Sequence, residues 1–170
     1  MAWCEYSNHE VKEMLCHSKL DYGFIVGEWE SKGIIKQKLA SKDMYLLVYE
    51  GHPFYEKQMI NIEMLKEENL IVMNEHFNMF HDFRKACEVR GFTPKIVAKT
   101  ADANFEHKLC RKGIGLAVVP GFTLEDFSME HMRAIPFQEA LKWEVYGVYK
   151  EERAHDRFIK RFEAFLMKDL

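Results

Sequence analysis

Short apolar runs alternate with segments of helical period between residues 70 and 119, and this alternation constrains the fold more than any other feature of the chain. The runs 70–73, 95–98 and 116–119 have the length and apolar character of buried strands. The segments about 77–89 and 102–111 lie between them and have the length of helices. Alternation of this kind predicts parallel strands joined by right-handed crossovers, and therefore an α/β fold.

The stretch RKGIGLAVVPG, residues 111–121, predicts how a helix passes into a buried strand. Gly113 follows the helix where a left-handed residue is needed, and Gly115 lets the helix and strand backbones approach closely. A phosphate-binding loop is the alternative interpretation. It is disfavoured because these glycines follow a helix instead of opening one, and because no Lys-Ser/Thr pair comes after them.

The flanking segments supply the other predicted elements. The start of the chain reads as strand, helix, strand, and Ser7 with Glu10 makes a capping-box signature for a helix over 8–17. A final helix is expected over 154–167, with an apolar face formed by Phe158, Ile159, Phe162, Phe165 and Leu166. The remaining strands are expected at 22–26, 34–40, 44–49, 132–136 and 143–149.

Charge and cysteine usage exclude several classes of protein. A net charge of −3 and a pI near 6.2 give no general attraction to nucleic acid. The four cysteines form no C-x-x-C pair, so a zinc knuckle or a thioredoxin-type site is not expected, and the thiols read as reduced. The start of the chain lacks the features of a signal peptide, and no apolar run is long enough to span a membrane. We therefore expect a cytoplasmic protein without a membrane partner.

Five segments together resemble a known family. The helix, glycines and strand of CRKGIGLAVVP (110–120) resemble an aG.GiallP motif, and KLDYGFIVG (19–27), YLLVYEGHPF (45–54), FRKACEVRGFTPKIV (83–97) and WEVYGVYKEER (143–153) follow the same family's order and spacing. In this ordered set the chain is similar to the effector-binding domain of LysR-type transcriptional regulators. The resemblance covers essentially all 170 residues.

The resemblance implies a type II periplasmic-binding-protein-like fold, in which two α/β lobes are joined by two crossing strands. Lobe I would contain residues 1–48 and 140–170, and lobe II would contain residues 49–139. A small effector would bind between the lobes, and DNA would be contacted only through a winged helix-turn-helix domain that this sequence lacks. The family's first strand and helix also have no counterpart here. An incomplete lobe I would expose apolar sheet surface, so we expect a homodimer.

Ligands of open α/β sheets bind beyond the carboxyl ends of the strands, where helix N-termini present amides and partial positive charge. Three predicted helix starts have this placement, and they nominate a site for a small, anionic effector, with Phe77 over its apolar part. The candidate residues are Ser7, Asn8, His76, Phe77, Asn78, Thr100 and Ala101. Each also has a plain structural interpretation, as a helix cap or as core.

The sequence indicates neither a metal site nor a cofactor. His9, Glu13 and His17 share one helix face, but the outer two would be about 12 Å apart, so a solvated polar face is the simpler interpretation. No catalytic motif is present, and we expect the protein not to be an enzyme. The leading hypothesis is an effector-sensing regulatory domain. The alternatives are a free-standing solute-binding protein of the same fold and, third, a small α/β enzyme that acts on an organic acid.

Overall fold

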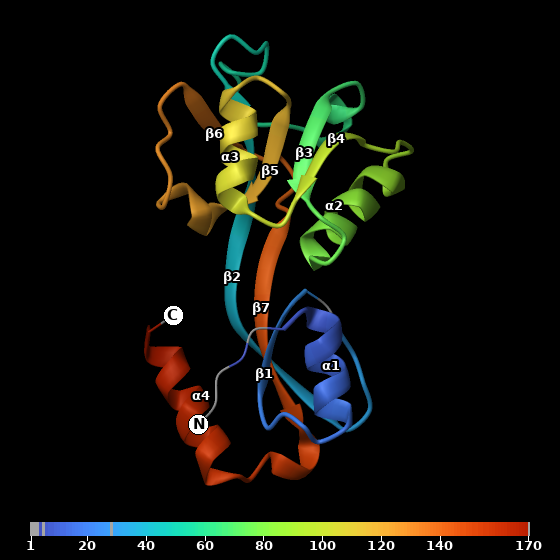
Figure 1. Cartoon of the computed structure of the whole chain (residues 1–170), viewed down its shortest axis with the longest axis vertical. Coiled ribbons are helices and arrows are strands. Elements are labelled where there is room, and N and C mark those ends of the chain that lie inside the picture. Colours follow the sequence, from blue (N-terminus) through green and yellow to red (C-terminus); the bar gives the residue numbers. More distant parts are fainter. Residues whose placement is uncertain (1–3, 5, 28, 170) are drawn as a thin grey trace. The chain divides into compact units, whose positions relative to one another are not determined.

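The computed structural model describes residues 4, 6–27 and 29–169, and it divides the chain into two compact units. Unit 1 comprises the chain up to Ser41 together with the chain from Glu144 onward, and unit 2 comprises Lys42–Trp143. Two strands, β2 (Ile34–Tyr49) and β7 (Lys142–Lys150), contribute to both units (Figure 1). The fold is mixed α/β and periplasmic-binding-protein-like. The lobe boundaries that the family resemblance implies are 48/49 and 139/140.

Unit 2 is built on the predicted parallel strands. In its sheet, β3 (Asn69–Met73) lies between β4 (Lys95–Thr100) and β5 (Leu116–Pro120) and runs parallel to both. Strand β2 continues the sheet beyond β5 as an antiparallel neighbour, and β6 (Met132–Pro136) pairs with β2. The parallel arrangement predicted from the alternating segments is therefore confirmed.

Helices cover both faces of this sheet. On one face, α2 (Asn78–Val89) packs Phe80, Phe83 and Cys87 against Leu70, Val72 and their neighbours. On the other face, Cys110 of α3 (Ala103–Arg111) packs against Ile71, Ala117 and Val119. Successive residues of a strand point to opposite faces, so a strand covered on both sides must be apolar throughout. This requirement explains the continuous apolar runs in β3 and β5. The short 3-10 helix η1 (Ile62–Leu65) also packs here, and it was not predicted.

The two glycines after α3 have the roles expected from the sequence. Gly113 has φ +70°, a left-handed conformation that L side chains rarely adopt. Gly115 has a different constraint, because a Cβ placed there would lie 2.6 Å from the carbonyl oxygen of Asn69. The backbone after α3 therefore passes so close to the start of β3 that only a glycine fits.

Unit 1 packs its helices around the β1–β7 ladder. Helix α1 (Asn8–Cys16) begins with the predicted capping box of Ser7 and Glu10, and its Val11 and Leu15 pack against β1 (Gly23–Val26) and β7. Aromatic side chains contact α4 (Arg157–Asp169): the Tyr22 ring meets the Phe162 ring edge-on, with centroids 5.2 Å apart. The strand expected before Ser7 falls largely on residues outside the described part of the chain.

Two expectations about the elements were wrong. Residues 34–40 and 44–49 form one strand, β2, because 41–43 contain no glycine or proline and two of them have partners on β7: Ser41 bonds to Glu144, and Asp43 pairs with Lys142 at 2.5 Å. The final helix begins at Arg157, after the 3-10 turn η3 (Glu151–Arg153). Of the five apolar residues expected along one face of this helix, Phe158 and Phe165 are 75% and 62% exposed.

Candidate functional site

The carboxyl ends of β3 and β4 lie side by side in unit 2. Met73 is paired with Thr100 in the parallel register, and the N–H of Asn74 donates to the Thr100 carbonyl at 2.8 Å. The chain leaves both strands at this edge and enters α2 and α3. The structure thus brings five of the candidate residues to one edge of one sheet: His76, Phe77, Asn78, Thr100 and Ala101.

The start of α2 has the features of an anion-binding site. Phe77 occupies the N-cap position and contributes no side-chain cap, because an aromatic ring has no acceptor for the amides of the first turn. The Asn74 side chain accepts from the His76 N–H at 3.0 Å and so shapes the loop that precedes the helix. Both His76 and Phe77 are exposed. The partial positive charge of this helix end is therefore not offset by a carboxylate cap.

The start of α3 differs, because its own side chains satisfy it. Asp102 is the N-cap and accepts from the Asn104 N–H at 2.8 Å. The Thr100 hydroxyl accepts from the Asp102 N–H at 3.0 Å. Thr100 as a residue is 9% exposed, whereas Ala101 is exposed. The Asp102 carboxylate already balances the dipole of this helix. An anion at this edge is therefore better placed at α2 than at α3.

One further ion pair sets the local charge. Glu75 lies 3.4 Å from the Lys99 ammonium, and hydrogen bonds from its own backbone N–H and from Lys99 lower the pKa of its carboxyl. The same ammonium lies over the Phe80 ring, 5.0 Å from its centroid. Glu75 and Lys99 offset each other, so the α2 dipole remains the main positive feature of this edge.

The other two candidates, Ser7 and Asn8, belong to unit 1. The Ser7 hydroxyl accepts from the Glu10 N–H at 3.3 Å, and the Glu10 carboxylate accepts from the Ser7 N–H at 2.8 Å, as the capping box requires. The Asn8 carboxamide bonds to both backbone groups of Val26. Both side chains therefore have structural contacts at the start of α1, and for Ser7 this is the cap expected from the sequence.

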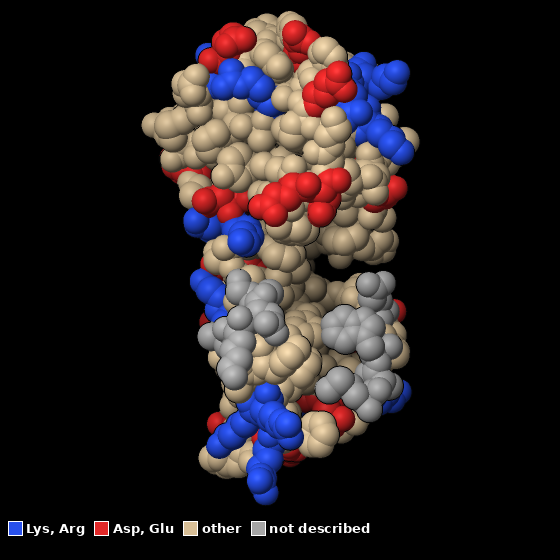
Figure 2. Space-filling view, turned by 90° about the vertical axis from the view of Figure 1, so that its left-hand side faces the viewer, with Lys and Arg blue, Asp and Glu red and all other residues tan. Residues whose placement is uncertain are grey.

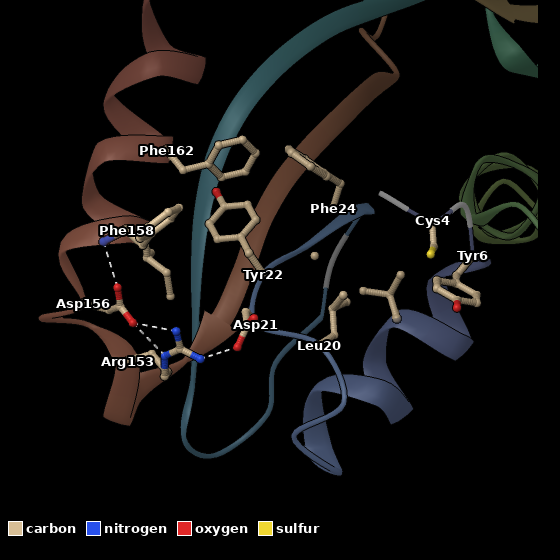
Figure 3. A pocket seen from close by; sticks show the side chains of 13 residues that line it. Cys4, Tyr6, Leu20, Asp21, Tyr22, Phe24, Arg153, Asp156, Phe158 and Phe162 are labelled. Carbon is tan, nitrogen blue, oxygen red and sulfur yellow. Dashed lines mark hydrogen bonds and ion pairs between the residues drawn. The ribbon is translucent and has the colours of Figure 1, made fainter. Parts of the chain in front are cut away.

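Unit 1 contains a cavity of about 610 Å³ that the sequence analysis missed (Figure 3). It lies between α1 and α4 along β1. Aromatic side chains line it at α4 and β1, and Asp21, Arg153 and Asp156 form a charged end. Asp21 and Arg153 are 132 positions apart in the chain, so no local pattern could have joined them.

Thiol and metal chemistry find no support in the described residues. They include no group of three side chains suited to a metal ion, and His9, Glu13 and His17 contact one another only in pairs. Burial raises the pKa of the Cys110 thiol to about 12, and this thiol donates to the Leu47 carbonyl. Nor do the described helices include one of the length and apolarity needed to cross a bilayer.

The family model for the LysR substrate binding domain matches residues 3–170. The chain belongs to this family. LysR substrate-binding domains are the effector-sensing regulatory modules of LysR-type transcriptional regulators, so the resemblance seen in the sequence is confirmed. A free-standing solute-binding protein is not favoured.

Curated relatives of this LysR domain are transcriptional regulators. The chain is similar to the HTH-type transcriptional regulator AlsR of Bacillus subtilis (strain 168), with 26% identity over 160 residues, covering 93% of this chain and 53% of that protein. It is also similar to the malolactic fermentation system transcriptional activator of Lactococcus lactis subsp. lactis (strain IL1403), with 26% identity over 104 residues, 61% of this chain and 35% of that one. The matched part of the chain thus spans about half the length of AlsR and about a third of the length of the malolactic fermentation activator.

Solved structures share the fold. The reduced form of OxyR from N. meningitidis superimposes with a TM-score of 0.81 at 19% identity, covering 95% of this chain and 76% of that one. The C-terminal domain of a probable LysR family transcriptional regulator from Rhodococcus sp. RHA1 gives a TM-score of 0.78 at 17% identity, with 95% and 81% covered. At these identities the likeness concerns the fold alone.

Proposed function

We propose that this domain binds a small anionic metabolite at the edge formed by β3 and β4, and that the parent protein uses the bound state to control transcription. The observation that carries the proposal is the joint end of these two strands beside the start of α2, which lacks a side-chain cap. A helix start with neither a side-chain cap nor an acidic residue in its first turn favours a carboxylate or a similar small anion.

Each candidate residue of unit 2 has a defined part in this proposal. The anion lies at the first turn of α2, where Asn78 begins the helix and the exposed His76 can donate a hydrogen bond. The Phe77 ring, 40% exposed, covers an apolar part of the ligand. Thr100 and Ala101 form the neighbouring wall at the end of β4. Ser7 and Asn8, at the start of α1 in unit 1, stay predictions from the sequence and are not part of this edge.

The setting of this activity is also proposed. We place the protein in the cytoplasm as a homodimer and assign DNA contact to another part of the parent protein. Two observations support that assignment. The net charge is −3, and on the face drawn in Figure 2 the Lys and Arg side chains form separate groups instead of one basic stripe. The domain is proposed to bind its ligand without turnover, in keeping with relatives that are regulators.

A ligand screen tests the proposal. Thermal-shift measurements with amino acids, aromatic acids and sugar acids should identify selective stabilisation by an anion, and the same mixtures should show no product. His76→Ala should then raise the Kd of the best anion about tenfold, equivalent to one charge-assisted hydrogen bond. His9→Ala is the matched control, since its side chain is 81% exposed in unit 1 and belongs to no proposed site.

Three results would contradict the proposal. An anion that stabilises the wild type but binds His76→Ala and Phe77→Ala with unchanged Kd would move the site elsewhere. A screen in which no anion stabilises the protein would remove the anionic class. Product formation would favour the enzyme alternative.

A further inference from the structure

Residues 121–131 form a strap that lies along α3 in unit 2 (Figure 1). The strap follows β5 and leads into β6. Both of its ends are tied down: the Thr123 hydroxyl donates to the Pro120 carbonyl at 2.8 Å, and the Glu50 N–H donates to the His131 carbonyl at 2.9 Å. Its middle is held by side chains of α3.

Two side-chain contacts hold the middle of the strap on α3. The Phe127 ring lies against the His107 imidazole, with centroids 4.3 Å apart. The Arg111 guanidinium donates through Nη2 to the Ser128 carbonyl at 2.6 Å. His107 and Arg111 are one turn apart, so both contacts come from the same face of the helix. The closed position of the strap therefore depends on this face of α3.

The imidazole of His107 is buried without polar partners. The residue is 2% exposed, and neither ring nitrogen has a hydrogen-bond partner among the described residues. A neutral ring is tolerated in such a place, but a charged ring is not, because it has neither water nor an acceptor. Burial, and then the positive charge of Arg111, accordingly lowers the pKa of this imidazole. The contact with Phe127 thus requires the uncharged ring.

The other ionisable groups around His107 leave this preference in place. Glu106 is buried next to it in the chain, and burial raises the pKa of its carboxyl, which favours the neutral form. Strands β3 and β5 carry no titratable side chain. None of the described carboxylates bonds to the imidazole, so the closed state offers no partner to its charged form. Further charged groups on the packed elements are exposed: Lys108 on α3, Lys95 and Lys99 on β4, and Glu125, Asp126, Glu130 and His131 on the strap.

We propose that protonation of His107 releases the strap from α3 and so makes this domain responsive to acid. A charged imidazole must reach water, and the strap is the side that yields, because α3 is also packed against the sheet through the fully buried Cys110. Release separates Phe127 from the ring and breaks the bond to Ser128. Strand β5 runs parallel to β3, so the strap begins at the sheet edge proposed for the anion, and its release alters that edge. The device itself holds whether or not an anion binds there.

Proteolysis at two pH values tests the proposal. Endoproteinase Glu-C cuts after glutamate at both pH 7 and pH 4, and the strap offers it Glu125 and Glu130. Cleavage is normalised to that of the isolated 119–133 peptide at the same pH, so that it reports the open fraction of the strap. The closed state is fully favoured above about pH 6.5 and loses its advantage as the pH falls toward 4, so cleavage at these two sites should rise by roughly tenfold to a hundredfold.

Two variants and their controls assign the effect. His107→Leu cannot take up a proton, so its strap should stay closed at pH 4, with less than about a threefold rise in cleavage. His9→Leu, at a side chain 81% exposed in unit 1, should behave as the wild type. Arg111→Gln removes the bond to Ser128 from an exposed position, so it should raise cleavage at pH 7 about threefold to tenfold without unfolding α3. Lys108→Gln removes another exposed cation of α3, which has no hydrogen bond to the described strap residues, and should leave cleavage unchanged.

Several results would overturn the proposal. Equal cleavage of the wild type at pH 7 and pH 4 would show that the strap stays closed over a charged ring as well. A rise in His107→Leu as large as in the wild type would assign the opening to the carboxylates of the strap instead. Cuts after glutamates throughout the chain at pH 4 would mean that acid unfolds the whole domain. If His107→Leu does not fold, unchanged cleavage of Arg111→Gln at pH 7 would still show that α3 does not hold the strap closed.

Discussion

The side-chain carboxamide of Asn8 bonds to both backbone groups of Val26: its Nδ2 donates to the carbonyl at 2.7 Å, and its Oδ1 accepts from the N–H at 3.1 Å. A neighbouring strand would offer the same donor and acceptor to an edge residue. The first residue of α1 is therefore tied to the last residue of β1. These two hydrogen bonds favour a structural role for Asn8. His76 and Phe77 are therefore the stronger candidates for contact with the effector.

Asn8→Ala should destabilise unit 1 by about 1–3 kcal/mol, because it removes two hydrogen bonds and leaves the groups of Val26 without the carboxamide. Urea denaturation should show a lower midpoint with an unchanged m-value. Ser7→Ala, which removes only the cap of the same helix, should cost about 1 kcal/mol. A larger loss in Ser7→Ala than in Asn8→Ala would contradict this assignment.

Two adjacent residues of α3 should give stability opposite dependences on pH. Glu106 and His107 are 1% and 2% exposed, and their side-chain polar atoms have no hydrogen-bond partner among the described residues. Burial raises the pKa of the Glu106 carboxyl well above its usual 4.5. Burial, and then the charge of Arg111, lowers the pKa of His107 to about 4. Both shifts favour the neutral form of the side chain in the folded protein.

The sign of each pH dependence follows from whether the folded or the unfolded chain binds the proton more tightly. Folded Glu106 keeps a proton that the unfolded chain releases, so its contribution is full below about pH 4.5 and declines as the pH rises. Unfolded His107 takes up a proton that the folded chain excludes, so stability rises with pH between about 4 and 6.5. The two dependences therefore oppose each other above about pH 4.5, and each slope is limited to about 1.4 kcal/mol per pH unit.

Single variants should expose each slope. Glu106→Gln should make the free energy of unfolding rise with pH between about 4.5 and 6.5, and His107→Leu should make it fall over the same window. Urea titrations at several pH values measure both. Parallel profiles for the two variants and the wild type would show that these groups keep their ordinary pKa values in the fold.

The thiols should divide into two classes. Cys4 and Cys16 are exposed, whereas Cys87 and Cys110 are buried, and burial raises their pKa to about 11 and 12. Since the thiolate is the reactive form, iodoacetamide at pH 8 should label Cys4 and Cys16 in the folded protein and all four cysteines in urea. Peptide mass spectrometry reads the sites. Labelling of Cys110 in the folded protein would show that α3 opens locally.

Elements whose signals are local were predictable from the sequence. Ser7 and Glu10 stand three residues apart, and the cap that they form is present. The parallel strands of unit 2 were recognisable in the sequence as continuous apolar runs, because helices cover both of their faces. The placement of His76 and Thr100 at one sheet edge follows from the same topology. Each of these features needs only neighbouring residues or the general rules of α/β folds.

Features that depend on distant residues were not predictable. The length of β2 is set by partners on β7, and Asp43 and Lys142 are 99 positions apart. Helical periodicity correctly grouped Phe158 with Phe162, but it cannot tell how much of that stripe another element covers. The burial of Glu106 was not predictable either, because a charged residue near the start of a helix is usually expected to be exposed to solvent.

The glycines after α3 allow left-handed backbone and steric contact to be tested separately. Gly113→Ala forces a side chain onto φ +70°, where its Cβ would meet the Tyr49 ring at an ordinary 3.5 Å, so it should cost about 1–2 kcal/mol. Gly91→Ala, at φ +79° in open space, is the control for conformation alone and should cost the same.

Gly115→Ala should be the most costly of the three, at about 3 kcal/mol, because its Cβ would lie 2.6 Å from the Asn69 carbonyl oxygen and 3.1 Å from its carbon. A flexible side chain could move aside, but these atoms belong to the backbone at the start of β3. Relief therefore requires the β3–β5 pairing to shift. Urea unfolding of the three variants measures the ranking, and a Gly115→Ala midpoint equal to that of Gly91→Ala would mean that this contact is looser than the structure shows.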